Sequence, residues 1–166
     1  MAVNGFLQSV SNPAVYAAGD AAGAGARLTP VAAYQGKVVA TNLLQGNHRK
    51  ADYSGVASVV CTVPPLGAVG LLEAEAAQQG LDFEARHERT GDWYSSRRVG
   101  ESCSAYKVLI ENGTGRILGA HLLGPGAEEQ VNLFALAIRA GITASGLEDA
   151  RFAYPTYGSD LGPMVS

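Results

Sequence analysis

An aspartate at the end of an apolar stretch is the first residue whose type and position could do chemistry. Ala14–Ala18 predicts a buried strand that ends at Gly19-Asp20, and a second short strand is expected at Val3–Val10. A carboxylate at the carboxyl end of a strand in an open α/β sheet commonly meets a ligand hydroxyl. The small residues after Asp20 leave its carboxylate uncrowded. The alternative is that Asp20 only caps a turn.

The element that follows is a helix. The Gly-rich segment 19–25 matches neither GxGxxG opening a helix nor a GxxxxGK phosphate loop, so it favours a flexible strand-to-helix connection. Thr29 is a good N-cap, Pro30 suits the first helical position, and Gly46 closes the helix. One or two strands and a helix cannot bury both faces of a sheet, so residues 1–46 need a host.

The remainder of the chain predicts a separate domain. Residues 47–55 are polar and indicate a linker, whereas residues 56–166 predict a compact α+β domain with an antiparallel sheet and flanking helices. The expected strands are Val56–Val63, Phe83–Glu88 and a hairpin of Tyr106–Glu111 with Arg116–Leu123 around Asn112–Gly115. The expected helices are Leu72–Gln79, Glu128–Ala140 capped by Gly141, and two short ones near Thr143 and Pro155.

Composition narrows the class of partner. The chain has 166 residues and a net charge of -3, and charged residues make up 16%, against about 25% in typical soluble proteins. This low charge indicates that a subunit or a neighbouring domain covers some uncharged surface. Mild acidity argues against nucleic-acid binding, and no apolar run approaches the ~18 residues of a membrane span. The expected location is the cytoplasm.

Cysteines and histidines do not form a recognisable metal site. Cys61 and Cys103 lie far apart without a CxxC pattern, and Cys61 is expected to be a buried thiol within an apolar strand. His48, His87 and His121 have no partners at metal-ligand spacing, and the last two are expected to be ordinary strand residues.

Longer stretches of the chain carry a resemblance to a known family. Val15–Ala21 and Leu28–Gly36 resemble the last FAD-binding motif of the flavin-dependent pyridine nucleotide-disulfide oxidoreductases, which include the glutathione, mercuric and lipoamide enzymes. Pro64–Ala76, Lys107–Glu129 and Phe152–Leu161 resemble their C-terminal dimerisation domain. The resemblance covers nearly the whole chain, in order and in spacing.

The resemblance implies that residues 1–46 are the C-terminal remnant of an FAD-binding domain. It also implies that residues 56–166 are a dimerisation domain. Asp20 would accept a hydrogen bond from a ribityl hydroxyl of FAD. The helix would direct its positive N-terminus at the flavin pyrimidine ring, and FAD itself would carry the hydride chemistry. The implied cofactor-binding residues are Gly19, Asp20, Thr29, Pro30, Val31 and Ala32.

The acid-base motif of the family is altered in this chain. Glutathione- and lipoamide-type members have His-Pro-Thr with a Glu five residues after the His, whereas this chain has Tyr154-Pro155-Thr156 with Ser159 at the Glu position. An imidazole with a pKa of ~6.5 shuttles protons at pH 7, and a phenol at ~10 seldom does. Mercuric-reductase-like members also tend to carry Tyr in this region. Tyr154 is therefore the candidate catalytic residue, with a plain interface aromatic as the alternative.

The resemblance also implies parts that these residues lack. No GxGxxG for FAD or NAD(P) and no CxxxxC redox disulfide is present, so N-terminal FAD and NAD domains are expected elsewhere, with NAD(P)H bound outside this chain. The expected function is the FAD-motif and dimerisation portion of a homodimeric flavin-dependent NAD(P)H oxidoreductase, inactive by itself. The alternative is an autonomous, non-enzymatic dimerisation module from a split or truncated gene. The electron acceptor and the choice between NADH and NADPH remain open.

Overall fold

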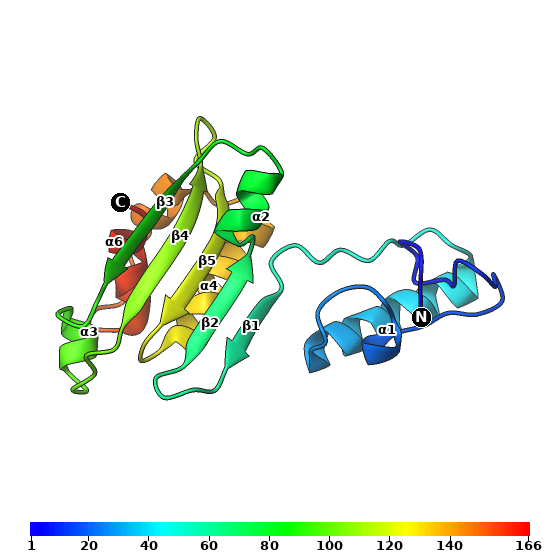
Figure 1. Ribbon diagram of the computed structural model, residues 1–166, viewed down its shortest axis with the longest axis horizontal. Coiled ribbons are helices and arrows are strands. Elements are labelled where there is room, and N and C mark those ends of the chain that lie inside the picture. Colours follow the sequence, from blue (N-terminus) through cyan, green and yellow to red (C-terminus); the bar gives the residue numbers. More distant parts are fainter. The chain divides into compact units, whose positions relative to one another are not determined.

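The computed structural model describes all residues from Met1 to Ser166 and divides the chain into two compact units (Figure 1). The first unit is Met1–Val56 and the second is Ala57–Ser166. Each unit has its own hydrogen-bonded structure, and each is described by itself below. None of the helices is both long enough and apolar enough to cross a membrane.

The first unit is built on one helix, α1 (Thr29–Gln45), preceded by a short 3-10 turn, η1 (Gly19–Ala21). The helix buries Val31, Gln35, Val38 and Asn42, which recur every three or four residues and therefore share one face. Leu28 occupies the N-cap in an extended conformation without a side-chain hydrogen bond. The prediction of Thr29 as N-cap is thus wrong by one residue, because Thr29 already has helical backbone geometry.

The two strands expected in the first unit do not form. Only single bridges link Val3 with Ser9 and Gln8 with Tyr16. A strand needs a continuous neighbour for its backbone groups, and the short segments of this unit offer each other one paired position at a time. Residues 47–55 pack on this unit: the Asn42 amide donates to the carbonyl of Arg49 at 2.8 Å.

The second unit is an α+β domain with an antiparallel sheet and flanking helices, which confirms the predicted fold class. All neighbouring strands are antiparallel, in the order β1 (Ala57–Val60), β2 (Leu66–Gly70), β5 (Ile117–Leu123), β4 (Ala105–Glu111) and β3 (Phe83–Arg89). The helical elements are α2 (Glu73–Gln78), α3 (Tyr94–Arg97), α4 (Ala127–Ala140), α5 (Ala144–Glu148), η2 (Tyr157–Asp160) and α6 (Leu161–Val165).

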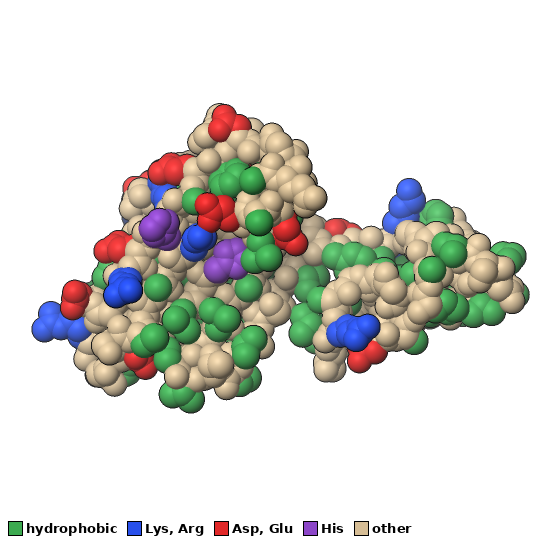
Figure 2. All heavy atoms as spheres, viewed as in Figure 1, with side chains coloured by type: hydrophobic (Ala, Val, Ile, Leu, Met, Phe, Trp, Pro, Cys, Tyr) green, Lys and Arg blue, Asp and Glu red, His purple; other side chains and the backbone are tan.

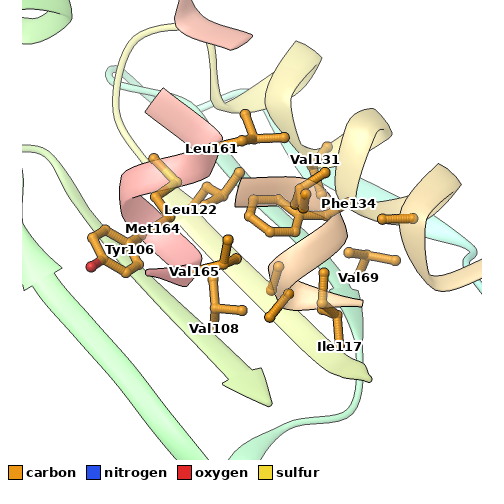
Figure 3. Packing of buried hydrophobic residues seen from close by; sticks show 14 of the residues in the cluster. Val69, Tyr106, Val108, Ile117, Leu122, Val131, Phe134, Leu161, Met164 and Val165 are labelled. Carbon is orange, nitrogen blue, oxygen red and sulfur yellow. The ribbon is translucent and has the colours of Figure 1, made fainter. Parts of the chain in front are cut away.

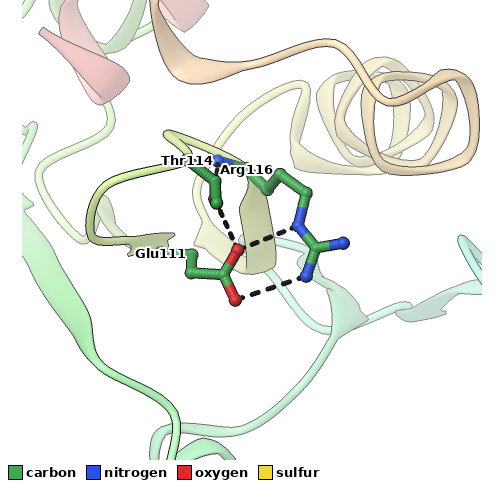
Figure 4. Close-up of polar contacts among 3 residues, drawn as sticks. All are labelled: Glu111, Thr114 and Arg116. Carbon is green, nitrogen blue, oxygen red and sulfur yellow. Dashed lines mark hydrogen bonds and ion pairs between the residues drawn. The ribbon is translucent and has the colours of Figure 1, made fainter.

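The predicted β4–β5 hairpin is confirmed, and a small polar network holds its turn (Figure 4). The Glu111 carboxylate accepts hydrogen bonds from the Thr114 hydroxyl and from Nε of Arg116, the latter at 2.9 Å. These donors from Thr114 and Arg116 hold the pKa of Glu111 below its ordinary value. The two strands are thereby fixed in register at the point where the chain reverses.

One face of the sheet is covered by α4, α5 and α6, and the core lies between them (Figures 1 and 3). Alternate residues of β4 point into this core, as period-2 geometry requires; they are Tyr106, Val108 and Ile110. Gly67 on β2 lets α4 come close, since a Cβ there would lie 2.8 Å from the carbonyl oxygen of Ala127. Phe134 of α4 is fully buried against the sheet.

Four details of the second unit differ from the expectations. β1 ends at Val60, where a turn closes with a hydrogen bond from the Thr62 amide, so Cys61 is exposed and not a buried strand residue. The strand β2 was not expected, because its glycines interrupt the apolar alternation. The four-residue helix α3 was also not expected, and the helical turn expected near Pro155 begins at Tyr157.

Candidate functional site

The structure places the Asp20 turn against the N-terminal end of α1. Gly19 has a φ of +64°, which favours glycine, and a Cβ there would lie 3.3 Å from the Cβ of Ala32. The turn therefore lies on the first turn of α1, and the Asp20 side chain is exposed beside it. The Asp20 turn and the first turn of α1, which the Gly-rich loop separates in the sequence, therefore lie side by side.

The helix end itself has free hydrogen-bonding capacity. Leu28 supplies no side-chain acceptor, so the amides of Thr29 and Val31 donate to no group of the chain. Pro30 has no N–H, and the Ala32 amide already donates to the Leu28 carbonyl. The exposed residues Thr29 and Pro30 border this end, while Val31 is buried beneath it. The positive end of the helix dipole is thus open to a ligand, with one carboxylate next to it.

A buried glutamine, which was not singled out from the sequence, fixes this arrangement. Gln35 is only 1% exposed, accepts a hydrogen bond from the Gly19 amide at 2.6 Å and donates to the Ala24 carbonyl at 2.9 Å. Its amide also donates to the Tyr53 hydroxyl at 2.8 Å. The connection 19–25 is therefore held at both ends, which corrects the expectation of a flexible loop. The available signal was a polar residue in the apolar stripe of α1.

The donor and acceptor groups at this place fit the contacts that the FAD motif implies. Asp20 can accept from a ligand hydroxyl, and the open helix end can receive electron-rich carbonyl groups of a heterocycle. The six expected residues, Gly19, Asp20, Thr29, Pro30, Val31 and Ala32, all lie in η1 or in the first turn of α1.

Tyr154 belongs to a second group of residues, in the other unit. Its side chain is 75% exposed, and its ring lies 6.0 Å from the ring of Tyr94, with planes tilted by 35°. The segment after it is anchored at η2, where Gln130 donates to the Tyr157 carbonyl at 2.7 Å and Arg98 lies over the Tyr157 ring. The phenol is therefore presented on a fixed segment with its hydroxyl free of protein partners.

Asp160 connects this segment to α3. The Ser95 hydroxyl donates to its carboxylate. Burial raises the pKa of Asp160 above its ordinary value, while the Ser95 hydrogen bond and the Arg98 charge act in the opposite direction. The Ser95–Asp160 contact joins residues that are far apart in the sequence, so spacing alone gave no sign of it.

The histidines of the second unit lie in one row on the sheet face opposite α4. Lys107 is the cross-strand neighbour of both His87 and His121, and Figure 2 shows the two histidines with a basic side chain between them. Lys107 pairs with Glu73 of α2 at 2.5 Å, which lowers the pKa of Glu73. His121 contacts the Leu71 carbonyl at 3.1 Å, and no cluster suited to a metal ion is present.

Comparison with known proteins agrees with this architecture. Residues 56–164 match the family described as pyridine nucleotide-disulphide oxidoreductase, dimerisation domain. The chain is 47% identical over 164 residues to an uncharacterized 19.7 kDa protein in the mercuric resistance operon of Staphylococcus aureus, covering 98% of this chain and 91% of that protein. It is 32% identical over 158 residues to the mercuric reductase of Staphylococcus aureus, covering 95% of this chain but 28% of the reductase.

Solved structures of flavoprotein reductases have a similar fold. The HOCl-induced flavoprotein disulfide reductase RclA from Escherichia coli superposes with a TM-score of 0.82 at 25% identity, over 98% of this chain and 37% of that protein. The chain thus spans about a third of the length of the reductases, and most of the length of the short Staphylococcus aureus protein. On the matched family and these relatives, the chain belongs to the pyridine nucleotide-disulfide oxidoreductase family, whose dimerisation domain it contains.

Proposed function

We propose that this chain supplies the last FAD-contacting segment and the dimerisation domain of a flavin-dependent, cytoplasmic NAD(P)H oxidoreductase that works as a homodimer. Electrons would pass from NAD(P)H through FAD to a disulfide, a metal ion or another acceptor. The single observation that carries the proposal is the Gln35 hydrogen bond to Gly19, because it holds the Asp20 turn at the open N-terminus of α1.

The FAD contacts would come from η1 and the first turn of α1. Asp20 would accept a hydrogen bond from a hydroxyl of the ribityl chain, with Gly19 and Ala32 in close contact beneath it. Thr29, Pro30, Val31 and Ala32 would place the positive helix end at the flavin ring, where it stabilises negative charge. When bound, FAD would accept the hydride from NAD(P)H, a step for which these residues provide only binding and electrostatics.

Tyr154 would contact the electron acceptor of the same enzyme. Its exposed phenol can donate one hydrogen bond to a bound acceptor and can pack against it, while η2 holds the segment in place. We therefore assign Tyr154 to positioning the acceptor.

A second candidate function has an observation of its own in its favour. The Staphylococcus aureus protein from a mercuric resistance operon is close to this chain in length, because the chain covers 91% of it. A self-contained, non-enzymatic dimerisation module would account for such a short relative. A module of this kind would associate with itself, without a flavin.

The native protein distinguishes the two candidates. An antibody against this chain should detect, in the cells that make it, a polypeptide of which these residues are about a third, as in the reductases. That polypeptide should copurify with FAD, and Asp20→Asn should release the flavin at a lower denaturant concentration, whereas the exposed control Asp149→Asn should not. A colourless protein of 17.1 kDa would reject the first function in favour of the module.

A further inference from the structure

An open hollow lies on the surface of the second unit beside α3. It has a volume of about 410 Å³ and is lined by Tyr94, Arg97 and Arg98. Tyr94 is 55% exposed, and its ring is paired at 6.0 Å with the ring of Tyr154. The Tyr94 ring therefore stands at one side of the hollow, next to two guanidinium groups, and the exposed ring of Tyr154 packs beside it.

The two arginines differ in how they are used. Arg98 lies 5.1 Å over the ring of Tyr157 and interacts with the Asp160 carboxylate. The guanidinium of Arg97 makes no hydrogen bond or ion pair within the chain, and it is exposed. Arg97 thus has a complete set of donors available for a ligand in the hollow.

No acidic side chain near α3 forms an ion pair with Arg97. Asp160 is engaged by the Ser95 hydroxyl, and Glu101 accepts from the Cys103 amide at 2.7 Å. Asp92, the remaining acidic residue next to α3 in the sequence, is exposed and does not pair with Arg97. The hollow therefore keeps a positive charge against aromatic surface.

We propose that this hollow binds small molecules in which an aromatic ring carries a carboxylate. A planar guanidinium takes a carboxylate through two parallel hydrogen bonds, and Arg97 has one such fork free. Aromatic rings pack on one another in offset or tilted arrangements, which Tyr94 and Tyr154 already adopt and a third ring can extend. The inference rests on the proposed function in one respect: if Tyr154 positions the electron acceptor, this hollow gives the chemical class of that acceptor.

A binding measurement on the full chain of 166 residues tests the site without flavin or a second domain. Nuclear magnetic resonance titrations with 2-naphthoate and with 2-naphthamide compare a charged and a neutral form of the same ring. We expect 2-naphthoate to bind with a Kd at least about tenfold lower, because only it forms the charge-assisted pair. The shifted signals should be those of Tyr94 and Arg97.

Substitutions of single residues test which side chains bind the probe. Arg97→Gln should raise the Kd of 2-naphthoate to that of 2-naphthamide, and Tyr94→Leu should weaken the binding of both. The control Arg27→Gln removes an exposed arginine of the first unit and should change neither. Fluorescence of Trp93, the single tryptophan, which packs beside Tyr106 at 5.8 Å, reports that each variant is folded.

Several results would overturn the inference. These are equal binding of the two naphthalene probes, no binding of 2-naphthoate, full retention of binding in folded Arg97→Gln, or tighter binding of 2-naphthyl phosphate than of 2-naphthoate. Each would leave the proposed function standing, because FAD retention and self-association are measured separately. Conversely, loss of the proposed function would leave a demonstrated carboxylate site in place.

Discussion

At position 154 the chain carries a phenol where the disulfide-reducing members of its family are expected to carry an imidazole. The phenol is exposed, and its neighbour in space is another tyrosine, Tyr94, with no acidic partner. An imidazole in the same place would need such a partner to fix its tautomer. The surroundings of Tyr154 thus suit packing and hydrogen bonding better than proton transfer.

In the flavoenzyme that we propose, we expect Tyr154→Phe to reduce turnover by about tenfold or less, since one uncharged hydrogen bond contributes about 0.5–1.5 kcal/mol. The rate profile between pH 6 and 8 should keep its shape. Steady-state rates of both forms across that range check this. A loss of more than about a hundredfold with a flattened profile would show that Tyr154 is a general acid.

The titration of Asp160 reports on the contact between α3 and the C-terminal segment. Burial raises its pKa, so the folded state favours the protonated form. The stability that this protonation contributes is complete below the ordinary pKa of 3.8, and it is lost as the pH rises through the raised value. The carboxyl carbon should titrate with a midpoint above 3.8 and, in Ser95→Ala, at a still higher pH. A midpoint at or below 3.8 in the unmodified protein would contradict the buried placement.

Removal of the Gln35 side chain should loosen the loop before it affects the rest of α1. In Gln35→Leu the Gly19 amide and the Ala24 carbonyl lose their partner, and each unsatisfied group costs about 1–3 kcal/mol. We expect much faster hydrogen exchange at Gly19. The matched control is Gln45→Leu, an exposed position on the same helix, and equal exchange in the two variants would refute the role of Gln35.

Among the elements, α4 is the main support of the sheet. Phe134 is fully buried beneath it, whereas Leu136 on the same helix is 60% exposed. We expect Phe134→Ala to lower the free energy of unfolding by about 3–5 kcal/mol. Leu136→Ala should change it by about 0.5 kcal/mol or less. Urea unfolding gives both values, and similar losses for the two variants would mean that the core lies elsewhere.

Elements with strong local signals could be predicted from the sequence. The β4–β5 hairpin follows from two alternating apolar runs around Asn112–Gly115, and α4 follows from its acidic first turn and its glycine cap, Gly141. The strand β2 could not be found in this way. Its glycine at position 67 is required by the close approach of α4, which is a tertiary contact and not a local pattern.

In the candidate sites, too, local sequence patterns could be predicted and tertiary contacts could not. The sequence motif grouped Asp20 with the N-terminal turn of α1, and in the structure Gly19, the residue before Asp20, lies against Ala32 of that turn. Gln35 and Tyr53, which hold the loop between them, were missed because their contact is made only when the chain folds. The pairing of Tyr94 with Tyr154 was missed for the same reason, since it spans most of the second unit's sequence.

At the scale of the whole molecule, the low fraction of charged residues calls for a covered surface. The second unit exposes apolar side chains on and beside β1 and β2, including Val60, Val63 and Leu66. Figure 2 shows hydrophobic side chains gathered at one end of the sheet face opposite α4. A family whose domain is named for dimerisation provides a natural partner in a second copy.

The oligomeric state is the most direct test of this account. Stable interfaces between identical subunits bury about 2,000 Å² or more and are apolar at the centre. We expect light scattering after gel filtration to give twice the chain mass of 17.1 kDa at micromolar concentration, unchanged over a tenfold dilution. A single monomer mass across the same dilution would contradict the assignment of this chain as a dimerisation unit.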